Sequence, residues 1–435
     1  MAAHRSRDRP TAAVYYERAH SFRVIIFLLV QCAAAADYSM RKLLLIFAFV
    51  VCACRAYPFT SVTVSQLENK LAARPAISDA ELAQRIGGLK LGERLSEAKF
   101  TSMLASLPGP LSQQALVAVA DQSEFLPPPK AEIPSIAAPN AAEQSRIVEL
   151  AAGYLDRTVP TLPDFIATRS TVRYQDRLLT PSNNVNSFET DLPLQLAERS
   201  TGAVLYRNHR EATVGSVRQG GPAAGKPGGL STNGTFGPIL GTVLADTAHA
   251  RMQWSRWEQS AAGLVAVFYF TVPQRDSHYL VSYCCVPPGN SRSDSRVDRK
   301  GAFEGRFGYR GEMTIDPTSG AILRLVLMAH LASTLPIDVA DIFVRYGPVE
   351  IGGKTYISPL KSVSVSRARA MLDVKGYNFS FVRGLSVNML TDTLFTNYNR
   401  FRGDVRIVEG DGDSRGDRTV QGMPAEPNGV PDAPQ

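Results

Sequence analysis

Residues 309–366 decide the fold, and they read YRGEMTIDPTSGAILRLVLMAHLASTLPIDVADIFVRYGPVEIGGKTYISPLKSVSVS. Apolar and β-branched residues alternate with polar ones in four runs, which is the pattern of half-buried β-strands. We predict strands over 309–315, 321–331, 342–351 and 354–366.

Turn chemistry joins these strands in sequence. The segment Asp316-Pro317-Thr318-Ser319-Gly320 follows the first strand, where Pro fixes φ and Gly accepts a positive φ. Gly352-Gly353 separates the last two strands, and a two-residue type I′ hairpin needs a positive φ at both positions. The stretch therefore predicts an antiparallel meander.

Length and charge limit the function classes. The chain has 435 residues, a hydrophobic content of 44% and a formal net charge of +7. Residues 1–39 carry +2 of that charge and residues 40–56 carry +3, which leaves +2 for the rest. Because a near-neutral body lacks the electrostatic footprint of a phosphate-binding surface, we expect no nucleic-acid partner.

Residues 40–56 read as a secretory signal peptide. The positive start Met40-Arg41-Lys42 precedes an apolar run over 43–51 and small residues up to Ala56. The apolar run is shorter than the ~20 residues that a membrane-spanning helix needs. We therefore predict an exported protein of the periplasm or the extracellular space.

Two features of the leader stay open. Residues 1–39 are interpreted as an over-long gene start, with an upstream signal peptide or a two-segment anchor as the rival interpretation. Cys54 follows Val51 and Ala53 as in a bacterial lipobox, but Cys52 at the −2 position departs from that pattern. The alternatives are a membrane anchor by lipidation at Cys54 and a soluble exported protein.

The remaining cysteines predict neither a disulfide framework nor a metal site. Cys284 and Cys285 are adjacent in a predicted strand over 279–286, where their side chains would point to opposite faces. We expect buried strand residues that are not bonded to each other. No CxxC or His cluster accompanies them, so no metal is assigned.

Composition divides the rest of the chain. Residues 57–124 predict a small helical region, in which Ser78 and Glu81 resemble a capping box. Residues 125–140 contain five prolines and predict a linker. We expect a helix over 141–158 at the start of an antiparallel β domain that reaches residue 408. The tail 409–435 has the composition of a disordered segment.

The sequence contains no motif for catalysis. GxSxG, HExxH, P-loop and GxGxxG patterns are absent from it. The histidines beyond the leader are scattered at 209, 249, 278 and 330. We therefore assign no catalytic residue, metal or cofactor. Whether the protein is an enzyme stays open, and a non-enzymatic role is the favoured alternative. A hydrolase would require a Ser or Asp that converges with a His in a cleft.

Apolar strand residues supply a candidate ligand cavity. The run over 264–270 is apolar on both faces, which implies a strand covered on each side. Trp254 and Trp257 lie three apart in a predicted strand and would face opposite sides, and core filling is the alternative role for Trp254. The residues that we predict to line a cavity are Trp254, Val267, Tyr269, Leu325 and Leu327.

The β domain resembles an uncharacterised family of secreted bacterial proteins. It is more remotely similar to the periplasmic lipoprotein-carrier half-barrels of the LolA/LolB/RseB type. The resemblance rests on the strand–DPxxG–strand element over 313–325 and on Val349-Glu350-Ile351-Gly352-Gly353-Lys354-Thr355-Tyr356. It implies a curved sheet that holds acyl chains against a helix, here the helix predicted over 141–158.

The expected fold is therefore α+β, with a strongly curved, half-barrel-like antiparallel sheet, a packed helix and a separate helical N-terminal region. The leading hypothesis is an envelope protein that binds a lipid, a lipoprotein or another acylated partner in an apolar concavity. It predicts a cavity of several hundred Å³ open to solvent, and a tightly packed sheet–helix interface would contradict it. The alternative is a structural or protein-interaction module of the cell envelope with an exposed apolar patch on residues 62–121.

Overall fold

The structure is a computed structural model. It describes residues 60–73, 77–176, 193–219, 229–231, 234–247, 252–261, 263–285, 296–297, 301–369 and 386–401. The predicted signal peptide, Cys54 and the tail 409–435 lie outside the described residues.

Six α-helices and fifteen strands make up the described chain. The helices are α3 (Val64–Ala72), α4 (Asp79–Gly87), α5 (Glu97–Ser106), α6 (Pro110–Ser123), α7 (Ala141–Thr158) and α8 (Pro238–Thr247), with 3-10 turns η1 (Lys130–Glu132), η2 (Val159–Thr161) and η3 (Gln274–Asp276). The strands are β1 (Thr60–Val62), β2 (Leu89–Leu91), β3 (Phe165–Gln175), β4 (Gln195–Arg207), β5 (Arg210–Gln219), β6 (Gly229–Leu230), β7 (Gln253–Ser260), β8 (Gly263–Val272), β9 (Leu280–Cys284), β10 (Phe303–Arg306), β11 (Tyr309–Ile315), β12 (Ile322–Ala329), β13 (Ile337–Ile351), β14 (Lys354–Arg369) and β15 (Ser386–Arg400).

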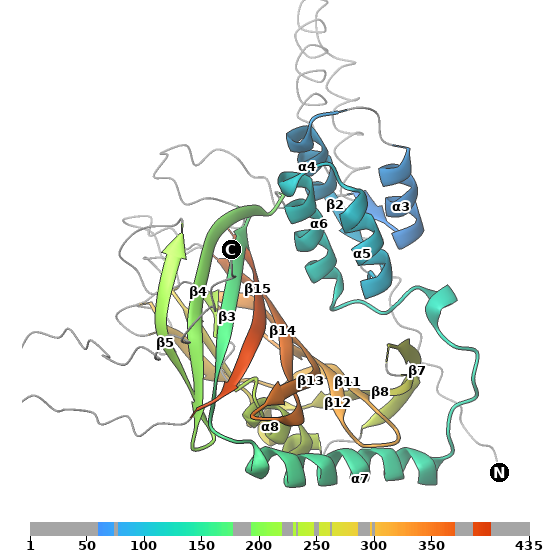
Figure 1. The fold of residues 1–435 in the computed structure, drawn as a ribbon, viewed down its shortest axis with the longest axis vertical. Coiled ribbons are helices and arrows are strands. Elements are labelled where there is room, and N and C mark those ends of the chain that lie inside the picture. Colours follow the sequence, from blue (N-terminus) through green and yellow to red (C-terminus); the bar gives the residue numbers. More distant parts are fainter. Residues whose placement is uncertain are drawn as a thin grey trace, which may run out of the picture.

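One large sheet dominates the fold (Figure 1). Its ten strands run in the order β5-β4-β3-β15-β14-β13-β12-β11-β8-β7, and every neighbouring pair is antiparallel. The predicted meander is confirmed as β11 to β14. The sheet twists across the molecule and is open, with β5 and β7 as its edges in the described chain. The architecture is α+β.

The two predicted turns have the backbone that their residues favour. Gly320 has φ 80°, and its N–H donates to the carbonyl oxygen of Asp316 at 2.9 Å. Gly352 and Gly353 have φ 61° and 79°, as a type I′ hairpin requires. These glycines set the register of β11–β12 and of β13–β14.

The two faces of the large sheet are covered differently, and we name each after its helix. On the α7 face, α7, α8 and the small sheet β10-β9-β6 enclose the main apolar core, which includes Phe268, Leu325 and Val344. On the α6 face, Ala118 of α6 packs on a smaller apolar group that includes Tyr174 and Phe343. The faces therefore bury different amounts of apolar surface.

Helix α7 covers the residues predicted for it, 141–158. The Asn140 side chain accepts from the N–H of Glu143 at 2.9 Å, which caps the first turn. Ile147, Ala151 and Leu155 are its buried residues, and their spacing of four places them in one stripe. In Figure 1, α7 runs along the end of the sheet opposite to the helices α3–α6.

The helices α3–α6 form a body with its own core, which we call the helical domain (the described residues of 60–126). Leu67, Ile86 and Leu116 are fully buried in it. Ser78 caps α4 by accepting from the N–H of Glu81 at 3.2 Å, as predicted. The parallel pair β1–β2 within it has no sequence signal, because three-residue strands are too short to show a period.

Two sequence predictions are wrong. Trp254 and Trp257 share the α7 face, with ring centroids 4.8 Å apart, because a bulge between Trp254 and Arg256 shifts the register of β7. Cys284 and Cys285 are bonded to each other across a cis peptide bond, and Cys285 is exposed. Their side chains therefore do not point to opposite faces.

Candidate functional site

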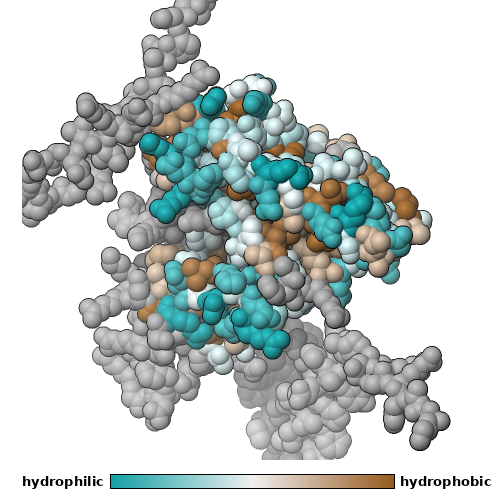
Figure 2. All heavy atoms as spheres, turned by 90° about the horizontal axis from the view of Figure 1, so that it is seen from below, coloured by the Kyte–Doolittle hydropathy of each residue, from teal (hydrophilic) through white to brown (hydrophobic). Residues whose placement is uncertain are grey.

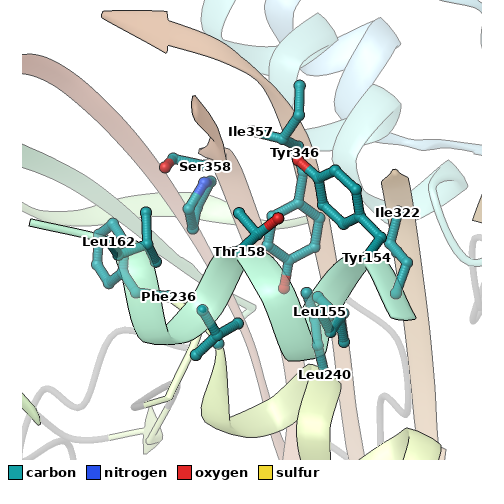
Figure 3. Close-up of a pocket in the computed structure, with 13 residues that line it drawn as sticks. Tyr154, Leu155, Thr158, Leu162, Phe236, Leu240, Ile322, Tyr346, Ile357 and Ser358 are labelled. Carbon is teal, nitrogen blue, oxygen red and sulfur yellow. The ribbon is translucent and has the colours of Figure 1, made fainter. Parts of the chain in front are cut away.

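A small cavity lies between α7 and the sheet. One wall comes from α7 with Tyr154 and Leu155, and α8 adds Leu240 near its start. The sheet supplies the opposite wall, with Ile322 of β12 and Tyr346 of β13. Figure 3 shows these side chains around one space. The lining is mostly apolar, so the site suits an apolar group rather than a charged one.

Two hydroxyl groups at the cavity lack partners. Tyr346 and Ser358 are 5% and 2% exposed, and neither Tyr346 Oη nor Ser358 Oγ has a hydrogen-bond partner among the described residues. Burial raises the pKa of Tyr346 well above its usual range, so this phenol stays protonated and can donate. An unpaired buried hydroxyl costs about 1–3 kcal/mol. A ligand oxygen that reached either hydroxyl would remove this cost.

The cavity has a volume of about 20 Å³, which holds about one water molecule. The expected open cavity of several hundred Å³ is therefore not present in the described part of the chain. The reason is close packing, because Ile147, Ala151 and Leu155 of α7 fill the space above Ile322 and its neighbours. The interface between α7 and the sheet is tightly packed in this structure, which contradicts a preformed open concavity under α7, so that binding at this place requires α7 to move.

The five predicted lining residues do not share one site. Trp254, Leu325 and Leu327 belong to the core of the α7 face. Val267 and Tyr269 alternate along β8 with the core residues Ala266, Phe268 and Phe270, so they point to the α6 face. Tyr269 is 36% exposed, Val267, Leu325 and Leu327 are buried, and none of the five lines the cavity under α7. Their role as ligand contacts stays a prediction.

The α6 face carries ion pairs that bind the helical domain to the sheet. Arg94 pairs with Glu258 on β7, and Arg345 on β13 lies 2.6 Å from Glu97 of α5. The Nζ of Lys361 on β14 donates to Asp121 of α6. These contacts were not predicted, because residues more than a hundred positions apart carry no common sequence pattern.

Buried arginines continue this network towards the edge of the sheet. Arg324 lies 3.6 Å from Glu312, and its guanidinium carbon stands 5.3 Å from the ring centroid of Phe343. Burial lowers the pKa of Arg324 to about 10, against the opposing charges of Glu124, Glu258 and Glu312. Arg94 adds to this lowering because it has the same charge. The helical domain thus sits on a desolvated surface of paired charged side chains.

A third arrangement joins α8 to η3 and β11. The fully buried Asp246 accepts from the backbone N–H of His278 and from Tyr309 Oη, both at 2.9 Å, and lies 2.6 Å from His278 Nδ1. The His278 side chain is 74% exposed. The neighbouring Ser277 Oγ donates to the Phe307 carbonyl at 2.6 Å, so it is not placed as a nucleophile for this imidazole.

Neither a metal centre nor a membrane-spanning helix is found in the described chain. No three His, Cys, Asp or Glu side chains converge as metal ligands in the ranges given above. Of the helices described, none is at once long and apolar enough to cross a bilayer.

Comparisons with known proteins leave the function open. No protein-family model matches the chain, and no curated protein matches it. The crystal structure of a LolA superfamily protein from Nitrosomonas europaea is similar over 60% of this chain and 98% of that chain, with 12% sequence identity and a TM-score of 0.26. The likeness is too weak to assign a function to this chain.

Proposed function

We propose that the protein is an exported binding protein for an acyl chain, which enters between α7 and the sheet. The observation that carries the proposal is the apolar cavity under α7 with the unpartnered hydroxyls of Tyr346 and Ser358. The closed interface has no room for an acyl chain, so α7 must move away from the sheet to admit one. The function of α7 is then that of a removable cover.

A thin apolar stripe holds α7 in place. Its buried side chains are Ile147, Ala151 and Leu155, which together stabilise the closed position by about 5 kcal/mol. Each methylene of an acyl chain contributes about 0.8 kcal/mol when it is buried. About six methylenes therefore offset the displacement of α7, and a longer chain gives net binding.

The surface around α7 is consistent with a helix that also tolerates water. Figure 2 views the molecule from the side on which α7 lies, and hydrophilic and hydrophobic residues are interleaved over the described surface. The outward residues of α7 include the exposed ion pair of Glu143 and Arg146, at 2.6 Å. Such a helix can leave the sheet without exposing a wholly apolar surface.

The two hydroxyls define the polar part of the ligand. Tyr346 Oη and Ser358 Oγ can both donate, so they suit the carbonyl oxygen of an ester, an amide or a protonated acid. The pocket supplies no cation among the residues that line it. We therefore expect acyl esters to bind more tightly than hydrocarbons of equal length.

Binding of a fluorescent fatty acid ester tests the proposal. Leu155→Ala removes a buried contact of α7 that also lines the cavity, and a Leu→Ala change in a core costs about 3 kcal/mol. We expect this variant to take up the ester about 100-fold faster, because the open state becomes more populated. Leu71→Ala is the matched control, since Leu71 is 5% exposed in the core of the helical domain, away from α7.

Three outcomes bear on the proposal. Faster uptake by Leu155→Ala alone, together with lipid in native mass spectra of the purified protein, supports it. If Leu155→Ala, Leu71→Ala and the unchanged protein all take up the ester at the same rate, the proposal is contradicted. It is also contradicted if none of them binds the ester. Weaker ester binding by Tyr346→Phe, with unchanged hydrocarbon binding, would identify the hydroxyl as the polar contact.

The interaction-module alternative lacks its expected surface in the described chain. Among the described residues of 62–121, Leu111 is the large apolar side chain that stands exposed, at 50%. One residue is too small an area for the apolar patch that this alternative predicts.

A further inference from the structure

Three buried charged side chains meet where α6 rests on the sheet. The Nζ of Lys361 on β14 donates to Asp121 Oδ1 of α6 at 2.5 Å and lies 3.5 Å from Asp392 Oδ1 on β15. The side chains of Asp121, Lys361 and Asp392 are 2%, 12% and 8% exposed. Two carboxyl groups therefore share one ammonium group at a place that water hardly reaches.

The two carboxyl groups have spare acceptor atoms. Asp121 Oδ2 is buried and has no hydrogen-bond partner among the described residues, and Asp392 Oδ1 is buried with only its 3.5 Å ion-pair contact to Lys361 Nζ. If both groups are ionised, the three side chains carry one net negative charge in a desolvated site. One proton, taken from solvent by either carboxyl group, makes the cluster neutral and supplies a donor for the other carboxylate.

The groups that face this cluster come from every element packed on it. They are Glu124 just after α6, Tyr174 of β3 with Arg199 of β4 beside it, Arg345 of β13 and the amide of Gln114 in α6. Glu124 adds negative charge, which favours a proton on Asp121. Arg345 opposes a proton on Asp392, but it is also paired with Glu97 at 2.6 Å.

We propose that the helical domain is a pH-controlled cap on the α6 face of the sheet. In the docked state Asp121 and Asp392 hold one shared proton beside Lys361, and loss of that proton as the pH rises releases the domain.

The direction of the pH dependence follows from burial. Desolvation raises the pKa of Asp121 well above its usual range, and the charge of Asp392 raises it further. Desolvation also raises the pKa of Asp392, although Lys361 counteracts part of this. When α6 leaves the sheet, both carboxyl groups regain water and their ordinary pKa. Docking therefore takes up a proton. Docking weakens about tenfold for each pH unit between the ordinary carboxyl pKa and the raised docked pKa, and above the docked pKa it changes no further.

The other contacts between the helical domain and the sheet do not supply this dependence. Arg94–Glu258 and Arg345–Glu97 join the same two bodies, and a guanidinium group stays charged throughout the neutral range. The apolar part of the contact is small and centres on Ala118, Tyr174 and Phe343. Contacts between domains that are polar and bury little apolar surface are commonly reversible.

Hydroxyl-radical footprinting of the full chain tests the proposal. Tyr174 and Phe343 are 3% and 1% exposed under α6, whereas Tyr269 is 36% exposed on the same face and serves as the internal reference. We expect the modification of Tyr174 and Phe343, relative to Tyr269, to rise with pH by up to about tenfold per pH unit and to level off once the docked carboxyl pKa is passed. A constant ratio between about pH 5 and about pH 9 would overturn the proposal.

Two substitutions locate the effect. Asp392→Asn replaces the protonated carboxyl group by an amide that needs no proton, so its footprint should not change with pH. Asp156→Asn is the matched control on an exposed position of α7, and it should keep the native pH profile. If Asp392→Asn shows the native profile, the shared proton is excluded. If Asp392→Asn does not fold, Asp121→Asn tests the same prediction from the side of α6.

Discussion

Arg256 on β7 and Glu312 on β11 form a bidentate ion pair across the strand that lies between them. Arg256 Nη1 lies 2.7 Å from Glu312 Oε1, and Nη2 lies 2.8 Å from Oε2. Strand β8 runs between β7 and β11, so the two side chains meet over it on the α6 face. Arg256 also donates to Glu258, which pairs with Arg94 of the helical domain. The pair thus links the sheet edge to that domain.

Loss of either partner should destabilise the protein. Arg256→Met leaves Glu312 with the more distant Arg324 at 3.6 Å, and Glu312→Gln leaves Arg256 paired with Glu258. We expect each change to lower the free energy of unfolding by about 2 kcal/mol. The double variant should lose about 1–2 kcal/mol less than the sum of the single losses. Urea denaturation measures these values. The exposed pair Arg85–Glu81 is the control, with an expected coupling of about 0.3–0.5 kcal/mol. Equal coupling in both pairs would contradict the interpretation.

Gly320→Ala should loosen α7. A Cβ at Gly320 would lie 2.4 Å from the carbonyl oxygen of Leu150 in α7, at φ 80°. Gly353→Ala is the matched control, because Gly353 has φ 79° and nothing within 4 Å of the added Cβ. Both variants carry a backbone cost of about 1 kcal/mol. Only Gly320→Ala should increase amide hydrogen exchange in α7, and equal exchange in the two variants would show that the turn does not position the helix.

Asp341 should give the protein a stability that falls as the pH rises. Burial raises the pKa of Asp341 to about 7, and the nearby Arg310 counteracts this only in part. The folded state therefore binds the proton more tightly than the unfolded state, and this stabilisation is lost between about pH 4 and about pH 7. Asp341→Asn should match the unchanged protein near pH 4 and exceed its free energy of unfolding by about 4 kcal/mol near pH 8. A difference that does not vary with pH would refute this.

Alanine should lower the free energy of unfolding at one glycine, Gly311, and raise it at another, Gly241. A Cβ at Gly311 in β11 would lie 1.9 Å from the carbonyl oxygen of Val326 in β12, so Gly311→Ala should cost about 3 kcal/mol or prevent folding. Gly241 lies in α8 with nothing within 4 Å of its Cβ position. Gly241→Ala should raise the free energy of unfolding by about 0.5–1 kcal/mol. Thermal denaturation of the two variants compares them directly.

Local signals in the sequence predicted the elements, but they carried no information on which residues the fold brings together at one site. The five predicted lining residues lie on strands whose order in the sheet the sequence specified only in part. Whether each side chain points to the α7 face or to the α6 face depends on the strand register and, in β7, on a bulge. The Asp246–His278 contact and the Asp121–Lys361 contact link residues 32 and 240 positions apart. No motif spacing brings such pairs together, so only the folded chain reveals them.

By itself, the sequence determined the antiparallel meander, because Pro317, Gly320 and the pair Gly352-Gly353 restrict the backbone within two or three residues of each turn. It also determined α7, since apolar residues four apart and a capping Asn140 act within a single helix. The tertiary structure decided that β15 pairs with β3, that the helical domain docks on charged residues and that α7 closes the cavity. These contacts depend on how the side chains of distant segments fit together and on how much water they lose when they meet. Both are set only when the chain has folded.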